Sequence, residues 1–341
     1  MIGLATGISQ LSQSEISLIR EAGVGWLRSG GFGFDLERFL RGEEQPPQFS
    51  AVKERIAALR KEGFNLLGIT PGPKNMPEIA GIPGSMAYLD NYRRICAFLG
   101  EQFHGLIDYW QVGNELDIWI FRASLSLEQS VEFLKAGILG LQGIDKGLKV
   151  GINITLFPSL PGKVDGNTDL HEGVFIAKSI YQDSGLHLDY AGFDSYPGTW
   201  RDGGPESWNE YLDGFHALTG KPIIIQEFGY ASEGALMNEA ENQSGIYPCA
   251  AKKWRFAWRG EHTRETQAQF IEESFRIFAQ KPFVIGATYF RWNDPETCWQ
   301  CGQRDCPAET AWGLVNRERN PKPSYYSFQS SVRKYFLNTI Q

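Results

Sequence analysis

Short apolar segments alternate along the chain with longer segments whose apolar residues recur at helical spacing. The short segments predict strands over residues 2–8, 24–28, 64–70, 107–112, 149–155, 188–195, 221–227 and 284–292. The longer segments predict helices over residues 12–23, 50–63, 88–103, 127–141, 170–182, 206–218, 263–279 and 323–336. Each predicted strand is followed by a helix, in eight successive units.

Local signals support this pattern of elements. Ser12 and Glu15 form a capping-box pattern where the first helix is expected to begin. Val52, Ile56 and Leu59 lie at helical spacing in the second helix. Strict alternation of strand and helix implies a parallel sheet that is covered by helices.

Eight strand–helix units in 341 residues fit an α/β fold of the (β/α)8 type, a TIM barrel, better than a doubly wound sheet. No linker, repeat or low-complexity tract divides the sequence. We therefore expect a single barrel domain over residues 1–341.

Two predicted strands, far apart in the chain, end on glutamate. The strand over residues 107–112 leads to Asn114 and Glu115, and the strand over residues 221–227 ends on Glu227. Side chains at the carboxyl ends of barrel strands face the site where ligands bind. The sequence therefore predicts two carboxylates that converge on one bond, which is the arrangement that glycoside hydrolysis requires.

The segments around these glutamates resemble the paired signatures of clan A, a large clan of retaining (β/α)8 glycosidases that includes endoglucanases, mannanases, β-xylosidases and β-galactosidases. The signatures here are Trp110-Gln-Val-Gly-Asn-Glu115 and Ile225-Gln-Glu227-Phe-Gly. The resemblance covers the whole chain. It extends to the segments 25–28, 189–197, 289–292, 312–315 and 321–325.

This resemblance implies a double-displacement mechanism with Glu115 as the general acid/base and Glu227 as the nucleophile. Arg28 would keep the nucleophile ionised and oriented, and Tyr196 would donate a hydrogen bond to it. Asn114 would bind the sugar 2-hydroxyl. The alternative for Glu115 and Glu227 is a pair of buried structural carboxylates, and the alternative for Arg28 is a stabilising ion pair.

The resemblance also implies substrate-binding roles for other side chains. Trp292 would form the floor of the sugar subsite, unless Trp292 and Tyr196 are only core aromatics. Trp119, Trp200 and Trp299 fall in expected upper loops, where they are candidates for outer subsites or for packing. Many clan members carry a histidine where this chain has Asp194, and the segment 68–73 lacks another histidine found in endoglucanase-like members. We expect Asp194 either to bind a different hydroxyl or to pair with Arg28.

Four cysteines fall in two loops that are expected to be neighbours. Cys298, Cys301 and Cys306 follow the eighth predicted strand, and Cys249 follows the seventh. The C-x-x-C spacing suits a structural zinc site, while one or two disulfides would suit a secreted protein. Free thiols are a third interpretation. Cys96 lies in a predicted helix as a small apolar residue, and we expect no cofactor for catalysis.

The composition of the chain limits the kinds of partner that we expect it to bind. A net charge of −7 and a pI near 5.4 argue against nucleic acid, and no run approaches the ~18 apolar residues of a membrane span. The first residues do not form a signal peptide, so we expect a cytoplasmic protein, or a secreted one whose leader was removed. None of the five histidines lies at a strand end, which disfavours catalysis by histidine or by a metal.

The leading hypothesis is thus a retaining β-glycosidase that acts on a β-linked oligosaccharide or polysaccharide. A non-catalytic carbohydrate-binding barrel is the alternative from another class, although such proteins usually lose one glutamate. Transglycosylation shares the same covalent intermediate and differs only in the acceptor.

Overall fold

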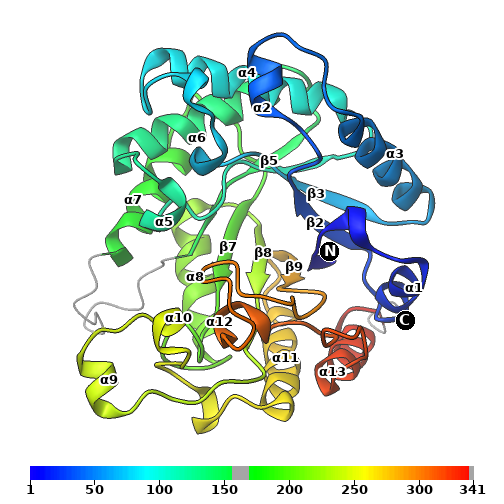
Figure 1. Ribbon diagram of the computed structural model, residues 1–341, viewed down its shortest axis with the longest axis vertical. Helices are drawn as coiled ribbons and strands as arrows, with labels where there is room; N and C mark the ends of the chain where they lie inside the picture. Colours follow the sequence, from blue (N-terminus) through cyan, green and yellow to red (C-terminus); the bar gives the residue numbers. More distant parts are fainter. Residues whose placement is uncertain (156–168, 338–341) are drawn as a thin grey trace.

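A computed structural model describes residues 1–155 and 169–337, and it shows a barrel of parallel strands surrounded by helices (Figure 1). The strands are β1 Ile2–Ala5, β2 Trp26–Gly30, β3 Asn65–Ile69, β4 Tyr109–Gln111, β5 Lys149–Gly151, β6 Asn153–Ile154, β7 Ala191–Ser195, β8 Ile223–Phe228 and β9 Val284–Tyr289. Their order in the sheet is β5-β4-β3-β2-β1-β9-β8-β7-β6. The first and last strands in this order, β5 and β6, are separated in the chain only by Ile152, so they act as one interrupted strand that closes the barrel. The predicted (β/α)8 fold is confirmed.

Helices follow the strands in sequence and pack outside them. The long helices are α1 Gln13–Glu21, α3 Pro47–Lys61, α4 Met86–Gln102, α6 Leu127–Gln142, α7 Asp169–Tyr181, α8 Ser207–Thr219, α11 Arg264–Phe278 and α13 Pro323–Val332, which continues as a π-helix over Arg333–Leu337. Each corresponds to a helix predicted from apolar spacing. Within the described residues, no helix is long and apolar enough to cross a membrane.

Short helices occupy segments in which the sequence pattern predicts no element. They are α2 Leu36–Leu40, α5 Trp119–Arg122, α9 Glu239–Gln243, α10 Pro248–Ala251, α12 Pro307–Thr310 and the 3-10 turns Ile8–Gln10, Pro73–Asn75, Glu78–Ala80 and Trp258–Gly260. Most of them lie in the loops that follow strands, where they shape the carboxyl-terminal face of the barrel. The predicted first strand over residues 2–8 is shorter than expected, since Ile8 begins one of these turns.

Side chains fill the amino-terminal half of the barrel interior. Leu67, Tyr190 and Ile224 form a buried cluster, with Met1 and Tyr109 packed against it. A larger core lies between the strands and the surrounding helices. The interior is therefore closed at one end, and polar side chains are left to gather at the other end.

The capping box predicted at the start of α1 is present. The Glu15 amide donates to Ser12 Oγ at 3.3 Å, and the Ser12 amide donates to Glu15 Oε2 at 2.9 Å. These bonds satisfy two amides that have no partner within the helix. Glu15 is also buried and accepts a hydrogen bond from Trp292, in the segment after β9, so this cap links the first helix to the end of the barrel.

Replacing Ser12 by alanine removes the side-chain acceptor of this cap. We expect Ser12→Ala to lower the free energy of unfolding by about 1 kcal/mol in denaturant titrations. Ser17→Ala is the matched control, because Ser17 is exposed within the same helix and alanine is favoured there. Equal losses in the two variants would contradict a specific capping role.

Candidate active site

Three carboxyl side chains meet at the carboxyl ends of β4, β7 and β8. Glu115 follows β4, Asp194 lies in β7 and Glu227 lies in β8. One carboxylate oxygen of each lies within 4.8 Å of those of the other two. The exposed fractions of the three residues are only 7%, 0% and 8%, in the same order. The structure thus brings together the two glutamates expected to form a catalytic pair, with Asp194 beside them.

A bulge in the pairing of β7 with β8 turns Glu227 into the barrel. The register shifts so that Asp194 pairs with Glu227, and Gln226 is passed over. A bulge allows two successive side chains to share one face of a strand. Gln226 donates to Tyr190 Oη at 3.1 Å in the interior, and Glu227 points to the same side. Simple alternation along β8 would have sent one of the two outward.

The turn after β4 directs Glu115 through an unusual backbone conformation. Gly113 and Glu115 have φ angles of 67° and 50°, in the left-handed region. Non-glycine residues in this region are uncommon and occur often at functional sites. The Glu115 amide donates to Asn153 Oδ1 at 2.9 Å, and Asn153 belongs to β6. This hydrogen bond fixes the turn against the neighbouring strand.

Arg28, in β2, connects the two glutamate-bearing strands. Its Nη1 contacts Glu227 Oε1 at 2.5 Å, its Nη2 donates to Asn114 Oδ1 at 2.8 Å, and its Nε donates to Gln111 Oε1 at 2.8 Å. Burial disfavours the cation, yet Glu227 and Asp194 outweigh this effect and raise the pKa of Arg28 above its ordinary value. A permanent positive charge therefore lies against one oxygen of Glu227.

Tyr196 holds the other oxygen of the same carboxylate. Its hydroxyl donates to Glu227 Oε2. Burial raises the pKa of Tyr196 well above 10, the ordinary value, so the phenol keeps its proton and remains a donor. With Arg28 on Oε1 and Tyr196 on Oε2, both oxygens of Glu227 are fixed from opposite sides.

Burial and neighbouring charges raise the pKa values of two of the three clustered carboxyls. Burial, followed by the charges of Glu227 and Asp194, raises the pKa of Glu115 well above its ordinary value. Burial and Glu227 likewise raise the pKa of Asp194, whose Oδ2 accepts a 2.5 Å hydrogen bond from Asn153 Nδ2. A carboxyl that keeps its proton near neutral pH can act as a general acid.

Asn114 has a defined amide orientation. Its Oδ1 accepts hydrogen bonds from Arg28 Nη2 at 2.8 Å, Gln111 Nε2 at 2.9 Å and Asn153 Nδ2 at 3.3 Å. Because the oxygen is the acceptor for all three donors, the amide nitrogen faces away from them. Asn114 also lines the adjacent cavity, so its N–H groups are directed toward a ligand there.

The predicted position of two side chains differs from the observed one. Trp292 is 1% exposed and donates from Nε1 to Glu15 Oε1 at 2.9 Å, on the helix side of the barrel. It therefore does not form the floor of the site. Asp194 is fully buried, and no ion pair within 4.0 Å joins it to Arg28, although its charge contributes to the raised pKa of Arg28.

Phe290, rather than Trp292, lies beside the cluster of carboxyl side chains. Its ring centroid is 5.9 Å from that of Tyr196, the residue bonded to Glu227. Trp312 packs against Tyr196 at 5.0 Å, so the three rings form one aromatic wall. The strand β9 ends at Tyr289, before the Trp292 that the resemblance implied as the floor of the sugar subsite.

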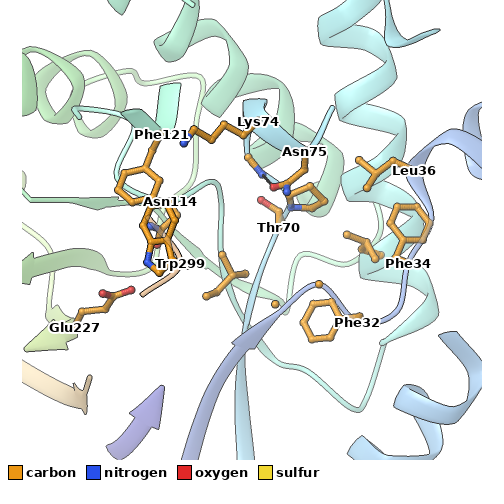
Figure 2. A pocket seen from close by; sticks show the side chains of 16 residues that line it. Phe32, Phe34, Leu36, Thr70, Lys74, Asn75, Asn114, Phe121, Glu227 and Trp299 are labelled. Carbon is orange, nitrogen blue, oxygen red and sulfur yellow. Dashed lines mark hydrogen bonds between the residues drawn. The ribbon is translucent and has the colours of Figure 1, made fainter. Parts of the chain in front are cut away.

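A cavity of about 550 Å³ opens beside Glu227 and Asn114 (Figure 2). It is lined mainly by the segments that follow β2, β3 and β4. At its side, the Lys74 ammonium lies 5.6 Å from the ring centroid of Phe121 and 5.8 Å from that of Trp299. The volume and the mixture of aromatic and polar groups are typical of small-ligand sites.

The three tryptophans expected in upper loops have different environments. Trp299 lines the cavity and is 54% exposed, as an outer subsite requires. Trp200 is half-buried between Tyr247 and Trp254, with centroid distances of 5.7 Å and 5.1 Å. Trp119 begins α5 and is 67% exposed. Of the three, only Trp299 is brought to the cavity that contains Glu227.

Sequence reasoning missed several polar residues of the site. Gln111 and Asn153 interrupt apolar strands, and this interruption was the available signal. Arg291 is half-buried near Glu227, and its guanidinium makes no hydrogen bond or ion pair with the residues that the structure describes. Glu309 is also buried, which raises its pKa to about 7, and it accepts a hydrogen bond from Gln300 at 2.7 Å. Both lie in the segment after β9, where the sequence shows no strand pattern.

The four loop cysteines are brought together, as the sequence predicted. Their sulfur atoms all lie within 4.8 Å of one another, and none is joined in a disulfide. Cys96 lies apart from them, buried in α4. The buried cysteines pack with Trp312, and Tyr196 and Phe290 pack against the same group.

Comparison with known proteins identifies the fold but not the family. The sequence matches no protein-family model and no curated protein. The structure resembles xylanase 10B from Thermotoga petrophila RKU-1 in complex with xylobiose, with a TM-score of 0.67 and 16% identity over 98% of this chain and 94% of the xylanase. It also resembles a glucosidase from Croceicoccus marinus, with a TM-score of 0.65 and 16% identity over 96% of this chain and 66% of the glucosidase.

A third similar structure is the GH2 β-galacturonidase from Eisenbergiella tayi bound to galacturonate. The TM-score is 0.61, with 16% identity over 98% of this chain, which spans only 51% of the galacturonidase. These three similar structures are glycoside hydrolases, and the similarity shows that this chain shares their barrel fold.

The raised pKa of Glu115 predicts a pH-dependent cost in stability. Below about pH 4.3 the side chain is protonated in both the folded and unfolded states. As the pH rises, the unfolded state loses this proton first, so Glu115 destabilises the fold increasingly. We expect Glu115→Gln to raise the free energy of unfolding by ~0.5–2 kcal/mol at pH 8, and by less at pH 4.5.

Urea titrations at the two pH values measure this difference. Glu54→Gln is the control, since Glu54 is exposed on α3, and its effect is expected to be the same at both pH values. A Glu115→Gln variant that gains no stability between pH 4.5 and pH 8 relative to wild type would rule out the raised pKa.

Proposed function

We propose that this protein is a clan A retaining β-glycosidase, with Glu115 as the general acid/base and Glu227 as the nucleophile. The observation that carries the proposal is the short separation of the two carboxyls, whose nearest oxygens lie within 4.8 Å. Retaining enzymes place their carboxyls about 5–5.5 Å apart, whereas inverting enzymes leave about 6.5–9.5 Å for a water molecule.

The surroundings of each glutamate suit its proposed role. The raised pKa of Glu115 favours its protonated form, which would deliver a proton to the leaving-group oxygen. Glu227, held by Arg28 and Tyr196, would attack the anomeric carbon and form the glycosyl-enzyme intermediate. Glu115, now deprotonated, would then remove a proton from the water that hydrolyses this intermediate.

Substrate binding would use the cavity beside the glutamates. The amide nitrogen of Asn114 faces this cavity and would donate to the sugar 2-hydroxyl, a contact that strengthens in the transition state. Phe290 would border the first sugar, and Trp299 would stack on the next one. Arg291 and Lys74 add positive charge near the site, so sugars with a carboxylate belong in the substrate panel with neutral ones.

Aryl β-glycosides of neutral sugars and of uronic acids provide the first test. We expect Glu227→Ala to lower kcat/KM by at least roughly 10³-fold, because the covalent step is lost. Azide should restore turnover and give a glycosyl azide of inverted configuration. In Glu115→Ala, azide should give a product of retained configuration, since the nucleophile is still present.

Glu54→Ala, an exposed change on α3, is the control for handling and expression. Proton NMR of the first sugar product identifies its anomeric configuration. Inversion by the wild type, or full activity of Glu227→Ala, would exclude this mechanism. Binding of sugars without turnover across the panel would instead favour a carbohydrate-binding barrel.

A further inference from the structure

Four cysteine sulfurs form a compact group between the loops that follow β8 and β9. We call Cys249, Cys298, Cys301 and Cys306 the thiol cluster. The Sγ atom of Cys249 lies 3.8 Å from that of Cys298 and 3.6 Å from that of Cys306. All four sulfurs lie within 4.8 Å of one another, and three of the residues are buried.

These distances are those of a tetrahedron around one metal ion. Zinc binds thiolate sulfur at about 2.3 Å, which places the sulfurs of a tetrahedral site about 3.8 Å apart. A disulfide brings two sulfurs to about 2.05 Å. Four thiols without a shared ligand are not expected to gather in one group. We propose that the thiol cluster binds one zinc ion as a closed, structural site with four cysteine ligands.

The backbone around the thiol cluster is folded as a metal-binding turn. Cys298 O accepts from the Gly302 amide at 2.7 Å, and the Cys298 amide donates to Gln303 O at 2.9 Å, which closes a tight turn around Cys301. Gly302 has a φ of 72°, so the turn requires glycine there. The backbone amide of Gln303 also bonds to the Cys301 sulfur. Amides that donate to sulfur stabilise thiolate ligands.

The fourth ligand comes from another short element. Cys306 precedes α12, and the Ala308 amide at the start of that helix bonds to its sulfur. Cys249 belongs to α10, in the loop after β8. One metal ion would therefore join α10, the C-x-x-C turn and α12, three separate pieces of chain.

An apolar shell surrounds the thiol cluster. Trp254, Trp312, Ala231, Ala308 and Ala311 pack with its buried cysteines. This shell covers the three buried cysteines, and four cysteine ligands leave no open coordination position. The zinc would thus be structural and would take no part in bond cleavage.

The thiol cluster supports one wall of the site. Trp312 belongs to its apolar shell and also packs on Tyr196, which holds Glu227. Loss of the metal would loosen the loops after β8 and β9, and with them this wall. The inference concerns the metal alone and stands whether or not the glutamates cleave glycosides.

Metal content is the direct test. We expect the full-length protein, purified without chelator, to contain roughly one zinc per chain by elemental analysis. Reconstitution of stripped protein with cobalt(II) should give the visible absorption of a tetrahedral tetrathiolate site. Stripping should also lower Tm, by on the order of 5 °C, because the metal stabilises only the folded state.

Matched cysteine variants locate the site. Cys301→Ser changes the exposed ligand and should lose zinc on dialysis against a chelator, while Cys96→Ala should keep it, because Cys96 lies in α4. Intact mass without reductant distinguishes the alternatives. A mass lower by two hydrogens per disulfide, or free thiols that bind neither zinc nor cobalt, would overturn the proposal. The wild-type metal content and cobalt spectrum decide the question even if Cys301→Ser folds poorly.

Discussion

The buried contact between Arg28 and Glu227 is the interaction on which the rest of the site depends. It joins residues 199 positions apart in the chain, and Arg28 is only 4% exposed. A buried guanidinium needs hydrogen-bond acceptors for its N–H groups. Besides Glu227, Arg28 donates to Asn114 and Gln111. The same four side chains thus fix the relative positions of β2, β4 and β8. Removing either charge would leave the other buried and unpaired, which typically costs about 3–5 kcal/mol.

The two sides of the site are built in different ways. Toward β2, β3 and β4, the segments leave a cavity with exposed rings and the Lys74 ammonium. Toward β7, β8 and β9, the aromatic wall of Tyr196, Phe290 and Trp312 is backed by the thiol cluster. The site is therefore open on one side and closed by packed aromatic rings on the other. Small-molecule sites commonly combine such an open approach with a rigid wall.

The regular parts of the molecule were predictable from sequence, whereas the parts that depend on irregular backbone were not. Period-two and helical spacing identified the barrel strands and the long helices, strand ends identified Glu115 and Glu227 as neighbours, and the resemblance added Arg28. The role of Trp292 was implied by the resemblance and does not hold, because the strand ends at Tyr289. Spacing gave no sign of this early strand end. It also gave no sign of the bulge in β8 or of the short helices in the loops, since these depend on contacts between distant segments.

The order of strands around the barrel has a consequence for folding. β1 pairs with β9, so one edge of β1 finds its partner only when the last strand of the barrel has been synthesised. Until β9 is available, β1 has an open edge, and open edges are prone to pair with other chains. Long-range closure of this kind also slows folding, because the loop entropy is lost before the contacts form. The partly synthesised barrel is thus the state most prone to misassembly. Before β8 is synthesised, Arg28 also lacks its ion-pair partner Glu227.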